Sequence, residues 1–347
     1  MPSDCNMATL GTRHFRSGIM QLRCAFYVFI LFSFMTCVAF PQTKSPNAYR
    51  AVVRGLTVGE LVGIAESAGQ GDAESQLLMG LSLQLVAERI EYDVEGRTGM
   101  LRLSAHWFRQ GAGKNFAPAR YFLAATDLRL LEDCDEIAPL LNEAITQNYL
   151  PAITALGRRY MEGGCRFKED YHEGLQWLTK ASEAGDAEAN YWIGRAYEQG
   201  LGVTADQREA TNWFSKGARM GDSSSQNSLA INLAEGNGTR KDLAQAIEWF
   251  RKSAETGNYE AACNLALLYI RGEGVAKDYV LALMWGLIAD RNATEIGCLS
   301  EIDTRALLQM SGAQESEATQ RANAWLKEHH YALTAPPKRT YPDKSEN

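Results

Sequence analysis

Tryptophan recurs along the chain at a fixed interval, and this interval constrains the fold more than any other feature of the sequence. Four of the seven tryptophans stand 36 residues apart, and an aspartate precedes each of them by seven residues. These residues are Trp177, Trp213, Trp249 and Trp285, with Asp170, Asp206, Asp242 and Asp278. Glycines keep the same interval at Gly185, Gly221 and Gly257, and again at Gly200, Gly236 and Gly272. Such self-similarity is typical of a solenoid, whose units bury their apolar surfaces only against neighbouring units.

Each unit has the pattern of two amphipathic helices. In the unit after Gly185, apolar residues fall at i, i+3, i+4 and i+7 from Ala189, and the same spacing starts again at Ala210. This spacing places them on one face of a helix. The periodic tryptophans lie on the second of these stripes beside alanine and phenylalanine. We therefore expect them in the core rather than in a ladder that stacks on sugars.

Helix ends can also be located within the unit. A glycine such as Gly200 provides the left-handed backbone conformation that commonly ends a helix. The periodic aspartates then begin the second helix. Three of them resemble capping boxes, in which an acid or amide stands three residues later. The pairs are Asp170 with Glu173, Asp206 with Glu209, and Asp242 with Gln245; Asp278 has Leu281 at that position.

The segment YEAACNLALLYIRGEGVAKDYVLALMW, residues 259–285, resembles the Sel-1-like repeat, a relative of the tetratricopeptide repeat. Four units fit the resemblance: 151–186, 187–222, 223–258 and 259–292. Two earlier units diverge, one from Gly71 with about eight extra residues before Trp107, and one from Ala117 to Asn148. The resemblance implies an all-α fold, a right-handed α/α superhelix of about six antiparallel helix pairs over residues 57–330. We expect a capping helix from Thr57 at one end and capping helices over 301–330 at the other.

The amino terminus has the pattern of an export signal. About fifteen uncharged, mostly apolar residues occupy 24–38, after Arg16 and Arg23. We expect residues 1–39 to be a signal peptide cleaved between Ala39 and Phe40, which makes the mature chain periplasmic or secreted and free of the membrane. An uncleaved anchor is the alternative, although this stretch is short for a transmembrane helix.

Two further segments fall outside the predicted array. Residues 40–56 have the composition of a linker or frayed lead-in. Residues 331–347 are polar and rich in proline, so we expect a disordered tail.

Charge and motifs exclude several classes of function. The net charge is −7, which disfavours nucleic acid as a partner because phosphate binding needs a basic surface. No motif of a serine hydrolase, a zinc peptidase or a nucleotide-binding loop occurs. His329 and His330 are adjacent, so on a helix they point about 100° apart, and a solvated helix end explains them better than a metal site does. We expect neither catalysis nor a cofactor.

The mature chain keeps four cysteines: Cys134, Cys165, Cys263 and Cys298. An even number in an exported protein permits disulfides. Cys134 and Cys165 fall in or beside corresponding loops of neighbouring units, and we predict a disulfide between them. For Cys263 and Cys298, a bond and two free thiols remain equally open.

These observations favour an exported scaffold that binds a peptide or protein on the concave face of the solenoid. The first helices of the units would line that face, with candidate surface positions such as Asn190, Arg195 and Gln226. Some Sel-1-like proteins with a cysteine pair in every repeat have been described as penicillin-binding or β-lactamase-like, so an enzyme acting on cell-wall or β-lactam substrates is one alternative. This chain lacks the regular pairing. A eukaryotic secretory-pathway adaptor is another, favoured if the sequons at Asn237 and Asn292 are glycosylated.

Overall fold

The computed structural model describes residues 46–87, 94–126, 134–164, 167–292, 298 and 310–329. These residues form helices and connecting turns, with no β-strand beyond one isolated bridge between Gly164 and Phe167. The all-α class predicted from the sequence is confirmed. The first helices are α2 (Pro46–Gly55), α3 (Val58–Gly69), α4 (Ala73–Ala87), α5 (Val94–Gly113), α6 (Ala117–Ala125), the 3-10 turn η2 (Cys134–Glu136) and α7 (Ile137–Thr146). The others are α8 (Leu150–Glu162), α9 (Tyr171–Glu183), α10 (Ala187–Gln199), α11 (Gln207–Arg219), α12 (Ser223–Glu235), α13 (Leu243–Glu255), α14 (Tyr259–Arg271), α15 (Tyr279–Asn292) and α18 (Gly312–Glu328).

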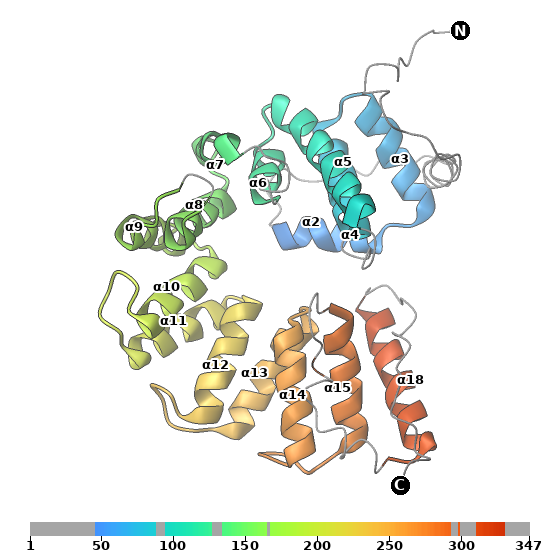
Figure 1. Cartoon of the computed structure of the whole chain (residues 1–347), viewed down its shortest axis with the longest axis vertical. Helices are drawn as coiled ribbons and strands as arrows, with labels where there is room; N and C mark the ends of the chain where they lie inside the picture. Colours follow the sequence, from blue (N-terminus) through green and yellow to red (C-terminus); the bar gives the residue numbers. More distant parts are fainter. Residues whose placement is uncertain are drawn as a thin grey trace.

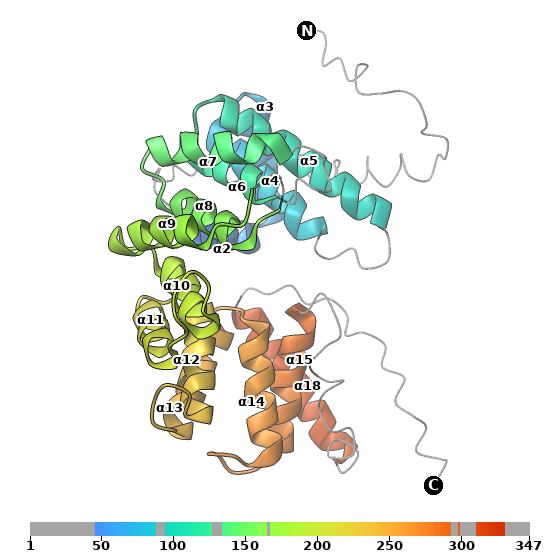
Figure 2. The same cartoon turned by 60° about the vertical axis from the view of Figure 1, so that its left-hand side comes forward.

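Consecutive helices pack as antiparallel pairs, and the pairs stack in chain order from α4/α5 to α14/α15. The stack bends into an open arc, so that α2 at one end faces the upper ends of α12, α14 and α15 across the inside of the curve (Figure 1). A second view, turned by 60°, shows the same two halves joined through α9 and α10 (Figure 2). The inner side of the arc is therefore enclosed by both halves of the chain.

The turn between successive units has one backbone conformation throughout the array. Gly71, Gly185, Gly221 and Gly257 all have φ between 93° and 94°. In the two units that the sequence pattern matches less well, the same place is taken by Asn115 (φ 61°) and Asn148 (φ 59°). Asparagine is among the few residues that tolerate positive φ, because its side chain bonds to the local backbone. The divergent units thus keep the turn while they change its residue.

In three of the four regular units, the residue after the periodic tryptophan is a large apolar side chain buried in the core: Leu178, Phe214 and Phe250. Phe214 is fully buried, and its ring lies against Gly194, where an added Cβ would come within 2.6 Å of it. The expectation that the periodic tryptophans form the core holds for Trp285, which is buried. The other three are only half-buried, and a lysine three residues later lies over each ring: Lys180 on Trp177 at 5.0 Å, Lys216 on Trp213 at 4.9 Å and Lys252 on Trp249 at 4.4 Å. A ring covered in this way has a cation on its outer face instead of a free stacking surface.

The predicted capping aspartates do begin the second helices, but as simple caps. Each accepts a hydrogen bond from the backbone N–H three residues later, at 2.9–3.1 Å, including Asp278, which lacks an acid or amide at that position. Reciprocal capping boxes occur instead at the two ends of the array, at Thr57 with Glu60 and at Ser311 with Gln314. The helix expected from Thr57 is α3, and the helix expected in the C-terminal capping segment is α18.

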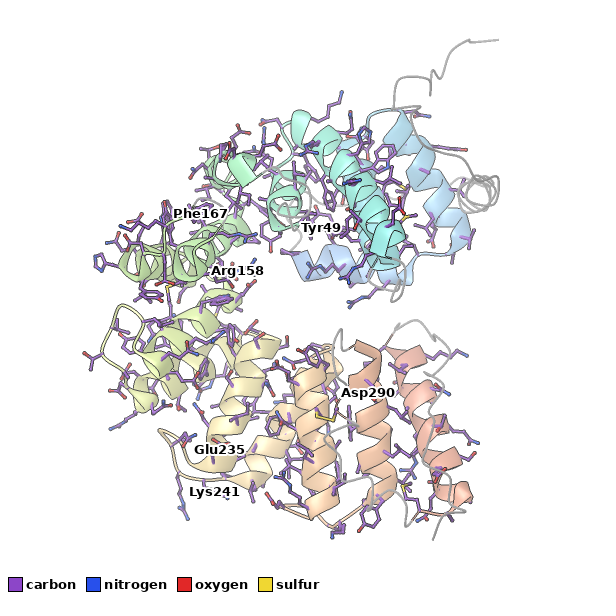
Figure 3. All side chains as sticks on the ribbon, viewed as in Figure 1. Tyr49, Arg158, Phe167, Glu235, Lys241 and Asp290 are labelled. Atoms are coloured by element: carbon purple, nitrogen blue, oxygen red, sulfur yellow. A yellow bond between two sulfur atoms is a disulfide. The ribbon has the colours of Figure 1, made fainter. Side chains whose placement is uncertain are left out.

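Residues 46–55, expected to be part of a linker, form the helix α2. Tyr49 and Val53, four residues apart on one face of α2, are buried against the first two units (Figure 3). The ring of Tyr49 meets the ring of Phe122 edge-on at 6.4 Å. The short helix is stabilised by this packing, because ten residues are too few for stability by helix propensity alone. The predicted signal peptide and the predicted C-terminal tail lie outside the described residues.

Candidate functional site

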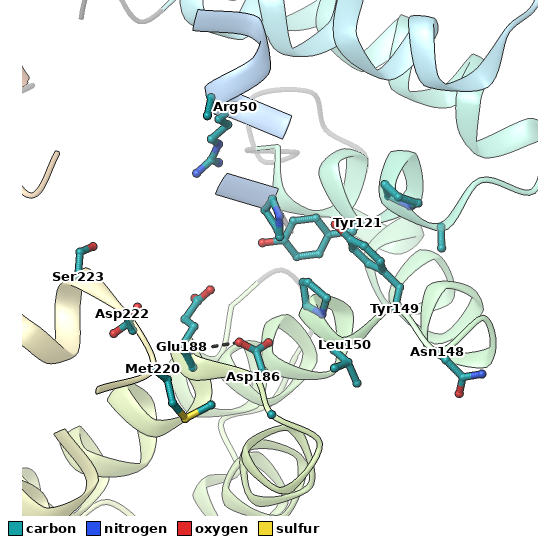
Figure 4. A pocket seen from close by; sticks show the side chains of 18 of the residues that line it. Arg50, Tyr121, Asn148, Tyr149, Leu150, Asp186, Glu188, Met220, Asp222 and Ser223 are labelled. Carbon is teal, nitrogen blue, oxygen red and sulfur yellow. Dashed lines mark hydrogen bonds between the residues drawn. The ribbon is translucent and has the colours of Figure 1, made fainter. Parts of the chain in front are cut away.

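A groove of about 1380 Å³ runs along the inner side of the arc. Its floor is made by the turns between units and the first residues of α6, α8, α10 and α12. Arg50 and Arg54 of α2 line one side, and Glu255 and His329 from the C-terminal half line the other. Figure 4 shows this groove from close by, with Arg50 opposite Glu188, Asp222 and Ser223. Because a helix N-terminus from each of four successive units reaches the groove, the repeat itself builds the site.

Three carboxylates form one wall of the groove. Asp186 and Asp222 cap the N-termini of α10 and α12, accepting backbone hydrogen bonds from Glu188 at 3.1 Å and Ser225 at 2.7 Å. Asp186 also accepts a 2.7 Å hydrogen bond from the Thr154 hydroxyl. The side chain of Glu188 is 42% exposed and extends into the open space of the groove (Figure 4). Helix capping explains why an aspartate occurs at each of these two positions, but it does not explain why both aspartates line the same wall of the groove.

The surroundings of the groove raise the pKa values of these carboxylates. Burial raises the pKa of Asp186, Glu188 and Asp222, and the charge of Asp186 raises the pKa of the other two further. Glu188 is exposed to water and yet has this shift, because the walls of the hollow replace much of its bulk solvent. The wall is therefore a site where negative charge is held at a cost.

Tyrosines form the floor beside this wall. Tyr121 and Tyr149 meet edge-on, with ring centroids 5.6 Å apart, and both are more than nine-tenths buried. Burial raises the pKa of Tyr121 to about 12, with the charge of Glu188 as the next cause, so the phenol stays protonated. Tyr149 takes the capping position of α8, which Asp186 and Asp222 take in the next two units, and its pKa is also raised by burial. The floor thus presents neutral aromatic surface and phenol hydroxyls.

Basic residues lie on the opposite side and at one end of the groove. Arg50 and Arg54 come from α2, and Lys114 comes from the turn before α6. Arg158 lies on the inner side of α8 (Figure 3), where its guanidinium is 3.7 Å from Glu188 and 3.8 Å from Glu162. The groove therefore has an acidic wall on one side and a basic wall on the other.

A smaller hollow of about 300 Å³ continues the inner surface toward the C-terminal units. Tyr191, Asn227 and Glu260 line it, and the Asn227 amide donates to Glu260 at 3.2 Å. Cys263 takes the place in its unit that Tyr191 and Asn227 take in theirs, and it forms a disulfide with Cys298 at a Cα–Cα distance of 5.5 Å. Figure 3 shows this bond in yellow beside α14. The question left open for this pair is answered by the bond, which holds Cys298 against α14.

Of the three candidate surface residues named from the sequence, two are buried and one is partly exposed. Asn190 is fully buried and accepts a hydrogen bond from Ser182 at 2.8 Å. Gln226 is also buried, where it donates to the Ala218 carbonyl at 3.3 Å. Both were placed on the surface wrongly, because their polar side chains satisfy backbone and hydroxyl groups between helices. Arg195 is partly exposed and lies over the rings of Tyr191 and Trp192.

The remaining predicted residues are two cysteines and the two adjacent histidines, of which His329 lines the groove. Cys134 begins the turn η2, and Cys165 falls in an undescribed gap, so their disulfide remains a prediction. His329 stacks on Trp325 with ring centroids 4.0 Å apart, and His330 is undescribed. Within the described residues, no group of three potential metal ligands occurs. None of the helices described is both long and apolar enough to cross a membrane.

Comparison with known proteins places the array in a family. Residues 150–186, 187–222, 223–258 and 260–289 each match the Sel1 repeat. The chain is a Sel1-repeat protein. The matched units agree with the four regular units predicted from the tryptophan interval, to within three residues at every boundary. Sel1 repeats are commonly protein-interaction scaffolds.

Solved structures show the same fold. A protective antigen present in uropathogenic Escherichia coli strains, which displays an SLR fold, is 24% identical with a TM-score of 0.56. The alignment covers 87% of this chain and 65% of the antigen, so the chain spans about two thirds of that protein's length. A Sel1 repeat protein from Oxalobacter formigenes is also 24% identical, with a TM-score of 0.50 and coverage of 71% of this chain and 97% of the other. No curated protein sequence matches the chain. At these identities, the likeness extends to the fold alone.

Proposed function

We propose that this Sel1-repeat protein is an exported scaffold that binds a partner protein or peptide in the inner groove. The observation that carries the proposal is the groove itself, which four successive units build from the same positions of the repeat. A groove of about 1380 Å³ is larger than the usual small-molecule pocket of about 300–1,000 Å³. It is also open along the arc, as an extended polypeptide would require.

Export is supported by two separate features. The apolar stretch at residues 24–38 follows arginines and precedes small residues, as in a secretory signal. The Cys263–Cys298 disulfide fits an oxidising compartment such as the periplasm or the extracellular space. N-terminal sequencing of exported protein tests the first feature. We expect Phe40 as the first residue, and mature material that retains residues 24–38 would instead support an uncleaved anchor.

Site-specific crosslinking tests the binding site. A photoreactive phenylalanine analogue replaces Ser223, whose side chain faces the groove (Figure 4), or Asn212, which is exposed on α11. In cells or exported fractions, we expect the probe at Ser223 to capture a protein that the probe at Asn212 does not. Equal capture from both positions, or capture from Asn212 alone, would place the interaction on another surface and refute groove binding.

A further inference from the structure

The hydroxyl of Tyr121 is a polar group without a partner at the centre of the groove. Its side chain is 9% exposed, and it makes ring contacts with Phe122 and Tyr149. Among the described residues, the hydroxyl makes no hydrogen bond. In Figure 4 the ring lies on the floor of the groove beside Glu188 and Asp186. A largely buried tyrosine usually finds a partner for its hydroxyl, so this one is available to an occupant of the groove.

The carboxylates beside Tyr121 are also incompletely paired. Within the described residues, neither Asp186 nor Asp222 has a cationic group within 4 Å. Glu188 accepts a 3.4 Å hydrogen bond from the Trp192 indole N–H, and its one cationic partner, Arg158 at 3.7 Å, is shared with Glu162. Burial raises the pKa of all three acids, and the charge of Asp186 raises the pKa of Glu188 and Asp222 further. A cation in the groove would relieve this repulsion.

The basic wall limits where such a cation can lie. Arg50 and Arg54 reach the groove from α2, so a cation is favoured only close to the opposite wall. The floor at that wall is aromatic, and an aromatic floor suits a long aliphatic stem that ends in a charge. Lysine and arginine side chains have this chemistry, and a free metal ion does not.

We propose that the inner groove seats a lysine or arginine side chain of the partner between the Tyr121 hydroxyl and the carboxylates of Asp186, Glu188 and Asp222. This assignment rests on the proposed function and names the chemistry that the groove recognises. The cation donates hydrogen bonds to the carboxylates and to the phenol oxygen, and its stem packs on the rings of the floor. The partner is thus a protein with an exposed basic residue in an extended segment.

The test uses three fluorescein-labelled peptides in which glycine alternates with a second residue. That residue, present four times, is lysine in the first peptide, glutamate in the second and glutamine in the third. Fluorescence anisotropy with the purified protein is read at about 150 mM salt, where the Debye length is about 8 Å and distant charges contribute little. We expect the lysine peptide to bind and the other two to bind at least tenfold more weakly. Preference for the glutamate peptide, or equal binding of all three, overturns the proposal.

Matched substitutions locate the interaction. Asp222→Asn removes a charge from the groove and keeps the cap, because asparagine is as good an N-cap as aspartate. Asp206→Asn makes the same change at the N-terminus of α11, away from the groove. We expect Asp222→Asn and Glu188→Gln each to weaken lysine-peptide binding about tenfold, as loss of a charge-assisted hydrogen bond does. Asp206→Asn leaves binding unchanged, and Arg50→Gln strengthens it about threefold because a repelling charge is removed.

The outcomes separate this proposal from the proposed function. If the groove variants and Asp206→Asn bind the lysine peptide alike, the cation site is wrong. In that case, partner capture from Ser223 that persists in Glu188→Gln still supports a binding groove. If the probe at Ser223 captures no protein selectively when the chain has no other substitution, the groove is not the binding surface, regardless of the peptide results.

Discussion

Replacement of Phe214 by alanine tests which aromatic residue holds the repeat together. Phe214 is fully buried, and Gly194 forms the facing wall with no side chain that could move into the space. Buried Phe→Ala changes cost about 3–5 kcal/mol, and the cost increases where the site cannot collapse. We therefore expect a loss of about 4–5 kcal/mol in the free energy of unfolding of the surrounding units.

The matched control is Trp213→Ala on the preceding residue. Trp213 is only half-buried, and its contact with Lys216 at 4.9 Å adds about 0.5–1 kcal/mol at an exposed site. We expect a loss of about 2 kcal/mol, half that of Phe214→Ala, although tryptophan is the larger residue. Urea unfolding gives the two values.

Hydrogen exchange read by mass spectrometry shows where the loss falls. A solenoid couples each unit mainly to its neighbours, so α10 to α13 should lose protection while α4 and α5 keep theirs. A larger cost for Trp213→Ala than for Phe214→Ala would refute the assignment of the core. Uniform loss of protection along the chain would refute nearest-neighbour coupling.

Three further results are expected. Reduction of Cys263–Cys298, or its replacement by two serines, should cost about 4 kcal/mol by the chain-entropy model for a separation of 35 residues, and an unchanged melting temperature with reductant would contradict this. Cys134 and Cys165 should be recovered as one cross-linked peptide from non-reducing digests, whereas recovery as free thiols excludes the bond. The folded pKa of Asp222 is raised, so the folded state binds that proton more tightly than the unfolded chain, and stability falls as pH rises from the ordinary value of 3.8 through the raised one. Asp222→Asn should therefore be more stable than the unsubstituted protein in urea at pH 7, with a difference that disappears at pH 3; a destabilised variant at pH 7 would contradict the sign.

The repeat could be predicted from the sequence because each of its parts has a local cause. A left-handed turn requires glycine or asparagine, and a helix start favours aspartate, so both leave a residue at a fixed interval. In the two divergent units the turn residues are Asn115 and Asn148, which do not fall on the 36-residue interval and therefore were not predicted as turns.

The groove could not be predicted in this way. Asp186 and Asp222 are visible in the sequence as helix caps, but their convergence on Tyr121 follows from the curvature of the array, which depends on packing between units. The helix α2 depends likewise on a distant contact, since Tyr49 is buried against Phe122, more than 70 residues later. The surface positions proposed at Asn190 and Gln226 failed for the same reason, because polarity alone does not show which side chains find partners between helices.

Arg54, close to the start of the array, and His329, at its end, line a single groove. A change in the number of repeats would consequently also change the width of the groove. Duplication of a single 36-residue unit is easily tolerated by an array whose units contact only their neighbours, but it would move His329 away from Arg54. Selection for an occupant therefore acts as selection for copy number, and lineages that gained or lost a unit would be expected to have exchanged their partner as well.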